Sequence, residues 1–253
     1  MSWQIVARVL SEGDNHPNED ACGFAGNTAW VIDGATSVLG PLSLPAASDP
    51  GWYSAALGQE LALAASLSGT RAVLAAALAQ IDRIGAQLVG EERVRFPSAA
   101  LSVVQLTFNR AGDCDGVEVL SLADCHVVVR ERGGAIKHVV AALADPQAAK
   151  MSSEDLAASR RRRNTTEGLW VARREPEAAE HALVVPCNAP ELLTLVSDGA
   201  WRAVDLGLIA SPEEFLDAVS TPIGVLELQT ELRQHQAAIG EKADDATILT
   251  LHP

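Results

Sequence analysis

The sequence predicts an α+β fold, a sandwich in which antiparallel β-sheets lie inside and α-helices pack outside. The first observation behind this prediction is the order of the expected elements: strands, two long helices, many strands, further helices and a last strand. The second is size, because 253 residues without an internal repeat or a low-complexity linker suit one domain built on large sheets. We therefore expect residues 1–253 to form a single domain.

The first part of the chain shows short apolar strands followed by two helical patterns. The expected elements are strands at residues 4–9, 21–24 and 28–32 and helices at residues 52–67 and 70–89. Gly26-Asn27 is a plausible tight turn between the second and third strands. Apolar side chains recur at helical spacing in the second helix, at Val73, Leu74, Leu78, Ile81, Ile84 and Leu88.

The rest of the chain is rich in strands and ends with helices and one more strand. Strands are expected at residues 99–108, 117–122, 126–130, 136–140, 169–172, 182–185, 192–196 and 246–251, and helices at 212–219 and 223–239. The polar segment 144–166 differs from its surroundings and carries four consecutive arginines, Arg160 to Arg163. We expect it to form a helical flap or loop.

Charge and cysteine usage exclude several classes of function. A formal net charge of −14 repels nucleic acid and anionic membranes, so we expect neither as a partner. The four cysteines form no CxxC pair, which argues against a zinc ribbon and favours reduced thiols. No signal peptide and no run of about 18 apolar residues is evident, so the expected location is the cytoplasm.

Acidic residues stand at the ends of several apolar strands. Asp33 follows the strand at residues 28–32, Asp198 follows the strand at residues 192–196, and Asp244 precedes the last strand. Two further acidic sites are Glu19-Asp20, which opens a strand, and Asp124, which lies between two strands. Side chains at strand ends lie at the rim of a sheet, where one cleft can collect several of them.

Crowded carboxylates repel one another unless cations neutralise them. Hard cations such as Mg²⁺ and Mn²⁺ prefer oxygen ligands. Two such ions about 3.5–4 Å apart lower the pKa of a shared water and clamp a phosphoryl oxygen. An Asp-Gly pair is also an everyday turn, so no single one of these residues predicts a metal site. Their number and position make a two-metal centre the hypothesis to test.

At this point the motifs resemble those of a known family, the metal-dependent PPM (type 2C) serine/threonine protein phosphatases, in a divergent bacterial-like branch. The resemblance runs in the right order across nearly the whole chain. Its segments are residues 18–20 (Asn-Glu-Asp), 30–36 (Trp-Val-Ile-Asp-Gly-Ala-Thr), 97–100 (Pro-Ser-Ala-Ala), 122–126 (Leu-Ala-Asp-Cys-His), 192–199 and 244–245. It implies a four-layer α-β-β-α sandwich of two antiparallel sheets flanked by helix pairs.

The resemblance also implies roles for individual residues. Two Mg²⁺ or Mn²⁺ ions would be held by Glu19, Asp33, the Gly34 carbonyl, Asp198 and Asp244. Asp33 would bridge both ions, and Asp20 would orient bound water. Asp124, with Asp198, would hold a third and weaker ion seen in some relatives. The implied partner is a phosphorylated protein, together with a kinase-linked signalling partner.

Two positions depart from the usual pattern of that family. Asn15 stands where an Arg often grips the substrate phosphate, and Ala35 stands where a His is a proposed general acid. His16 is a candidate proton donor because of its near-neutral pKa, although a lone loop His is more often simply exposed.

Three residues are candidates for binding the substrate where the usual Arg is missing. Arg163 belongs to an arginine run that could bring a guanidinium over the cleft, or could form a solvated helix face. Arg173 lies where the family often has a Ser-Arg pair, and Thr36 can line the cleft or serve only as a turn residue.

Three functions remain open from the sequence. The first is metal-dependent hydrolysis of phosphoserine and phosphothreonine monoesters by water activated at a two-metal centre. The second is a weak or inactive binding module of the same fold, which the changes at Asn15 and Ala35 favour. The third is a phosphatase for a small phosphorylated metabolite.

Overall fold

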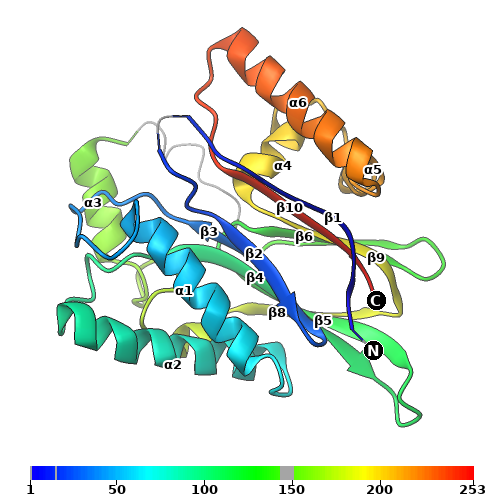
Figure 1. Cartoon of the computed structure of the whole chain (residues 1–253), viewed down its shortest axis with the longest axis horizontal. Coiled ribbons are helices and arrows are strands. Elements are labelled where there is room, and N and C mark those ends of the chain that lie inside the picture. The colour runs from blue at the N-terminus through cyan, green and yellow to red at the C-terminus, as the bar shows by residue number, and fades with distance from the viewer. Residues whose placement is uncertain (1, 15, 143–150) are drawn as a thin grey trace.

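The fold is known from a computed structural model that describes residues 2–14, 16–142 and 151–253 (Figure 1). The strands are β1 (Gln4–Ser11), β2 (Ala21–Ala25), β3 (Thr28–Gly34), β4 (Ala99–Phe108), β5 (Cys114–Leu122), β6 (His126–Glu131), β7 (Ile136–Val139), β8 (Leu183–Asn188), β9 (Pro190–Val196) and β10 (Ala246–His252). The helices are α1 (Asp49–Ala64), α2 (Thr70–Val89), α3 (Ser153–Arg161), α4 (Asp198–Asp205), α5 (Pro212–Ala218), α6 (Pro222–Ile239) and the short 3₁₀-helix η2 (Pro176–Ala179).

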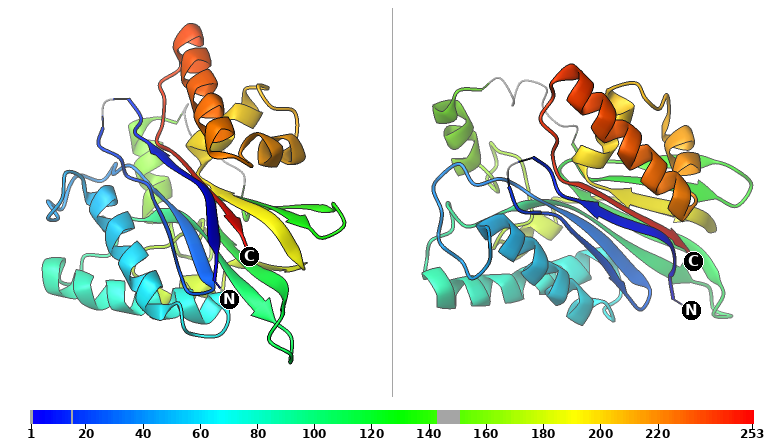
Figure 2. Two further views of the ribbon diagram at one scale, coloured as in Figure 1. Left: turned by 45° about the vertical axis from the view of Figure 1, so that its right-hand side comes forward. Right: turned by 45° about the horizontal axis from the view of Figure 1, so that its top comes forward.

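The strands form two five-stranded antiparallel sheets that face each other. The strand orders are β1-β10-β9-β6-β7 and β2-β3-β4-β5-β8. Helices α1 and α2 cover the outer face of the second sheet, while α4, α5 and α6 cover the outer face of the first (Figures 1 and 2). The predicted four-layer α-β-β-α sandwich is therefore confirmed.

Strand β4 shows how the sequence builds the layers. Its first eight residues are all buried, so it reads as a continuous apolar run rather than an alternation. Successive side chains nevertheless point to opposite faces. Leu101 and Val103 pack beneath α1 and α2, whereas Val104 and Leu106 lie between the two sheets. One strand thus contributes to two cores.

Helix α2 matches the predicted bounds, and its apolar stripe explains its position. Val73, Leu74, Leu78 and Ile81 are fully buried against the sheet and α1. By length and hydropathy alone α2 is apolar enough to span a membrane. The burial of its apolar stripe within the sandwich is what a core helix of the same composition also shows.

Helix α1 begins three residues earlier than predicted, because the Ser48 hydroxyl accepts a hydrogen bond from the Gly51 N–H at 3.1 Å and caps the helix. The prediction of a strand at residues 169–172 was wrong. Only a single bridge joins Ala172 to Ala99, since the Val171 N–H donates to the Asn164 side chain instead of a strand.

Helix α3 lies inside the segment predicted as a flap, of which residues 144–150 fall outside the described ranges. Helix α4 was not predicted. Asp198-Gly199 suggested a turn, but Ser197 has extended backbone geometry and Asp198 begins a helix. The unforeseen helix matters for the site, because it sets the direction of the Asp198 carboxylate.

Candidate active site

The acidic residues predicted from strand ends meet at one edge of the two sheets. In antiparallel sheets the end of one strand lies beside the start of the next, and here Asp33 pairs with Ala100 at the start of β4. A pocket of about 180 Å³ opens at this edge. We call it the acidic pocket, and its carboxylates belong to Asp20, Asp33, Asp124, Asp198, Asp244 and Asp245.

Two glycines allow the strands to approach closely at this edge. A Cβ on Gly34 would lie 2.3 Å from the Glu19 carbonyl oxygen, and one on Gly199 would lie 1.9 Å from that of Asp245. Any side chain there would force the backbones apart. Gly34 therefore allows the end of β3 to pack against the residues that precede β2. Gly199 likewise allows the start of α4 to pack against the residue that precedes β10.

Asp33 and Asp198 form the buried centre of the pocket. The Asp198 N–H points to Asp33 Oδ2 at 3.4 Å, which links the two sheets across the site. Burial raises the pKa of Asp33 well above its usual value, and the charges of Asp198, Asp20 and Asp124 raise it further. Burial, together with the charge of Asp124, raises the pKa of Asp198 to about 6. The pocket thus concentrates carboxylates of one sign, and no described side chain forms an ion pair with Asp33 or Asp198.

Asp20 lies deeper and is incompletely satisfied. Burial raises its pKa to about 7 and the charges of Asp245 and Asp198 add to this, while the hydroxyl groups of Thr247 and Ser197 act in the opposite direction. Its Oδ2 atom has no hydrogen-bond partner among the residues that the structure describes. A buried acceptor without a partner costs about 1–3 kcal/mol, so this oxygen fits a role that requires a ligand, a cation or a water.

Both Asp244 and Asp245 line the acidic pocket, although the sequence pointed only to Asp244 as a metal ligand. The Asp244 side chain is 67% exposed at the mouth of the pocket, whereas that of Asp245 is 4% exposed. Asp245 accepts hydrogen bonds from the N–H groups of Gly13 at 2.7 Å and Glu19 at 2.6 Å. It ties three chain segments together, and sequence reasoning missed it as a separate site residue.

His16 is half-buried rather than freely exposed. Its Nε2 lies 3.8 Å from Asp244 and its Nδ1 lies 3.7 Å from Asp245. It stands beside the acidic pocket without lining it. Asn15 occupies the position at which the resemblance would place a phosphate-binding Arg, and it lies outside the described residues.

Glu19 and Thr36 connect the acidic pocket to the loop before α1. Thr36 lines the pocket and donates a hydrogen bond to Glu19 Oε2 at 3.3 Å. Glu19 is buried on the far side of Thr36 and lines a neighbouring hollow instead. Burial raises the Glu19 pKa, which hydrogen bonds from Ser48 and Thr36 offset only in part. The structure therefore brings Glu19 near the other acids, but not into the same pocket.

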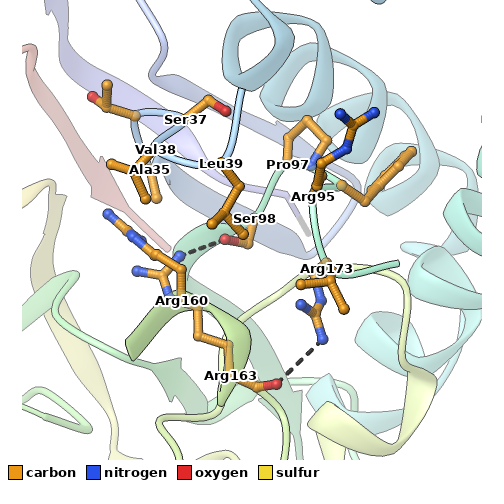
Figure 3. Close-up of a pocket in the computed structure, with 13 residues that line it drawn as sticks. Ala35, Ser37, Val38, Leu39, Arg95, Pro97, Ser98, Arg160, Arg163 and Arg173 are labelled. Carbon is orange, nitrogen blue, oxygen red and sulfur yellow. Dashed lines mark hydrogen bonds between the residues drawn. The ribbon is translucent and has the colours of Figure 1, made fainter. Parts of the chain in front are cut away.

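The predicted substrate-binding arginines lie in a narrow second pocket next to the acidic pocket (Figure 3). Arg163 lines both pockets and donates a hydrogen bond to the Ser98 hydroxyl. Arg173 lines only the second pocket, where it pairs with Glu175 at 3.0 Å and donates to the Arg163 carbonyl at 3.2 Å. Arg173 thus holds the chain after α3, while Arg163 faces the acids.

Comparison with known proteins shows which fold this is. No family model and no curated protein matches the sequence. Solved structures match over the full chain. The PPM Ser-Thr phosphatase MsPP of Mycobacterium smegmatis is 16% identical, with a TM-score of 0.57 over 100% of this chain and 99% of that one. The chain has the PPM phosphatase fold. The resemblance inferred from the motifs is confirmed at the level of the fold.

Two further solved structures give the same result. Serine/threonine phosphatase Stp1 of Staphylococcus aureus is 12% identical, with a TM-score of 0.61 over 100% of this chain and 97% of that one. PppA of Pseudomonas aeruginosa, described as a key regulatory component of T6SS, is 16% identical, with a TM-score of 0.61 over 100% and 98% of the two chains. At this identity the likeness establishes the architecture alone.

Whether metal ions fit this PPM-fold pocket can be judged from its donors. Among the described residues, no three His, Cys, Asp or Glu side chains already converge on a point that would hold an ion. The donor set is nevertheless all oxygen, crowded and buried, and the Asp20 Oδ2 atom has no partner within the described chain. Such a set suits a hard divalent cation, which would relieve the carboxylate repulsion that adds to burial in raising the pKa of Asp33.

Proposed function

We propose that this chain is a phosphatase that hydrolyses phosphoserine and phosphothreonine monoesters with the help of Mg²⁺ or Mn²⁺. The observation that carries the proposal is the set of buried, like-charged carboxylates at one edge of a PPM-fold sandwich, centred on Asp33 and Asp198. Isolated structural carboxylates would instead be paired or hydrogen-bonded. The relatives named Ser-Thr phosphatases support the choice of reaction.

Each carboxylate has a distinct part in this proposal. Asp33, Asp198 and Asp244 would hold the ions, with Glu19 and the Gly34 carbonyl near the first of them. Asp124 would contribute to a third ion. Divalent cations bound there would neutralise the carboxylates, increase the acidity of water in the pocket and attract the phosphoryl group.

Asp20 is the group of this chain suited to receive a proton. Its side chain lines the acidic pocket and its Oδ2 atom has no partner within the described chain, so it can accept a hydrogen bond from a water in the pocket and take its proton. His16, next to Asp244, is the candidate for returning a proton to the leaving group. The natural substrate would be a phosphorylated protein of a kinase-linked signalling system in the cytoplasm.

The test is phosphate release from phosphoserine and phosphothreonine peptides and from an aryl phosphate. We expect release that requires Mn²⁺ or Mg²⁺ and disappears in Asp33→Asn and Asp198→Asn. A metal-loaded protein that leaves all these substrates intact would contradict the proposal. A panel of small phosphorylated metabolites, run in parallel, separates a protein phosphatase from a metabolite phosphatase. Calorimetric titration with Mn²⁺ identifies an inactive module, which would bind no ion.

A further inference from the structure

The four consecutive arginines at the end of α3 have different environments. Arg161 and Arg162 are exposed to solvent. Arg160 instead lines both the acidic pocket and the narrow second pocket next to it. Figure 3 shows the Arg160 side chain reaching from α3 into the pocket, on the side of Ala35. One residue of the run is therefore directed inward, and helical geometry separates it from its neighbours.

The Arg160 guanidinium is buried beside carboxylates without pairing with them. Its Nε and Nη1 atoms have no hydrogen-bond partner among the described residues, and no carboxylate of the described chain lies within ion-pair distance. Burial lowers its pKa, while the nearby charges of Asp124 and Asp33 act in the opposite direction. A structural arginine would satisfy these donors, as Arg174 does with Asp82.

Arg163 lies three residues further on, just beyond the end of α3, and lines the same two pockets. Its Nη1 donates to Ser98, so it has a neutral partner and keeps its positive charge uncompensated. The backbone that carries both arginines is held in place. A Cβ on Gly168 would lie 1.8 Å from the Arg162 carbonyl oxygen, and Arg173 donates to the Arg163 carbonyl at 3.2 Å.

We propose that Arg160, assisted by Arg163, binds the phosphoryl oxygens of the substrate at the mouth of the acidic pocket. The inference rests on the proposed phosphatase function, and it assigns the phosphate-binding role to α3. A phosphomonoester dianion offers several oxygen acceptors, which match the unused donors of a planar guanidinium. Six carboxylates would otherwise repel such an anion, and these two arginines supply the opposite charge beside them.

The chain offers a matched control for testing Arg160. Arg160→Ala and Arg161→Ala remove the same charge from adjacent positions of α3, but only Arg160 faces the pocket. The probe is inorganic phosphate, titrated by calorimetry into the Mg²⁺-loaded protein. We expect Arg160→Ala to weaken phosphate binding at least tenfold and Arg161→Ala to change it less than twofold. Arg160→Lys keeps the positive charge but loses the planar guanidinium, so its phosphate affinity should be intermediate.

Two further measurements separate the possible failures. Thermal unfolding shows whether Arg160→Ala still folds, and Mg²⁺ titration shows whether its metal affinity is kept. Equal phosphate affinity in Arg160→Ala and wild type, or no phosphate binding by the wild type, would overturn the inference. If the wild type binds phosphate through Arg160 but cleaves no phosphomonoester, the proposed function fails while the phosphate site stands. With an active enzyme, Arg160→Ala should raise KM more than it lowers kcat.

Discussion

Two groups of charged side chains each surround buried charged residues in this protein, and their charges are balanced in opposite ways. The acidic pocket gathers carboxylates of one sign, and the pKa values of Asp33 and Asp198 are raised there. The second group, which we call the arginine network, joins residues of both signs. Its members are Asp82, Arg93, Arg173, Arg174 and Glu175.

The arginine network satisfies nearly every donor that it buries. Arg174 is fully buried, and its Nε donates to Asp82 at 2.9 Å, while its Nη1 donates to the carbonyls of Gly90 and Glu92. It also lies over the Phe96 ring at 5.2 Å. A Cβ on Gly85 would approach the Arg174 Nε to 2.9 Å, so α2 needs a Gly to let this side chain pass.

The contrast teaches how to tell a structural charge from a functional one. Burial acts to raise the pKa of a carboxylate in both places. In the network, hydrogen bonds from Arg93 and Arg174 outweigh burial, and the pKa of Asp82 falls. In the acidic pocket nothing of opposite sign pairs with Asp33 within the described chain, and its pKa rises. Buried charge without an ion-pair partner marks a candidate functional site.

The largest expected effect comes from breaking the network. Arg174→Met leaves Asp82 and two carbonyls without their buried partner, and such a loss costs about 3–5 kcal/mol of folding free energy. We expect the thermal midpoint to fall by roughly 10 °C. The matched control is Arg93→Met, which removes a 38% exposed partner of the same Asp82 and should cost about 1 kcal/mol or less. Equal losses in both variants would show that Arg174 is not the centre of the network.

Removing a charge from the acidic pocket should have the reverse consequence. Asp33→Asn relieves repulsion, so we expect unchanged or higher stability of the metal-free protein in chemical unfolding. Phosphatase activity should fall about a hundredfold or more, because several kcal/mol of metal-dependent stabilisation are lost. Glu180→Gln, at an exposed position outside the pocket, is the control and should leave both properties unchanged. A clear loss of stability in Asp33→Asn would place Asp33 with the structural charges.

Addition of metal should raise the stability of the folded protein through the acidic pocket, and this gain should not depend on the arginine network. At a free Mn²⁺ concentration of 100 times Kd, the folded protein gains about 2.7 kcal/mol. We expect a rise in thermal midpoint for the wild type and for Arg93→Met, and little rise for Asp198→Asn. Differential scanning fluorimetry measures the shift. A full shift in Asp198→Asn would remove this residue from the proposed ligands.

The smallest effect is a pH dependence that belongs to the network. Burial acts to raise the pKa of Glu175, but hydrogen bonds from Arg173 and Asn164 outweigh it and the pKa is lowered. This stabilisation is present above the unfolded pKa of about 4.3 and is lost as pH falls through the folded pKa. Chemical unfolding at pH 7 and at pH 3 should show a smaller acid-induced loss for Glu175→Gln than for the wild type. The same loss in both would assign the acid sensitivity to other groups.

Much of the fold and of the acidic pocket could be predicted because both depend on local patterns. The apolar stripe of α2 has helical spacing, and the residues of β4 form an unbroken apolar run. Acids that interrupt such strands must lie at sheet edges, which is why Asp33, Asp124 and Asp198 were found. That the single domain spans residues 1–253 stays a prediction.

Contacts between distant segments were beyond the reach of the sequence. Asp244 and Asp245 are neighbours in the chain, yet one is exposed and the other is tied to Gly13 and Glu19, more than 200 residues away. Nothing local distinguishes them. The arginine run poses the same problem, since only the docking of α3 decides that Arg160 faces the pocket and Arg161 faces solvent.

The sequence by itself therefore determined the layers, the strand-end acids and the likeness to PPM phosphatases. These follow from the spacing of apolar residues and from the identity of single residues, and both can be read without knowing which other segments pack against them. The tertiary structure alone decided which carboxylates share a pocket, that Glu19 lies across Thr36 from the others, and that Arg160 is left with unused donors. The reason is that burial and pairing depend on what the rest of the chain places beside a residue.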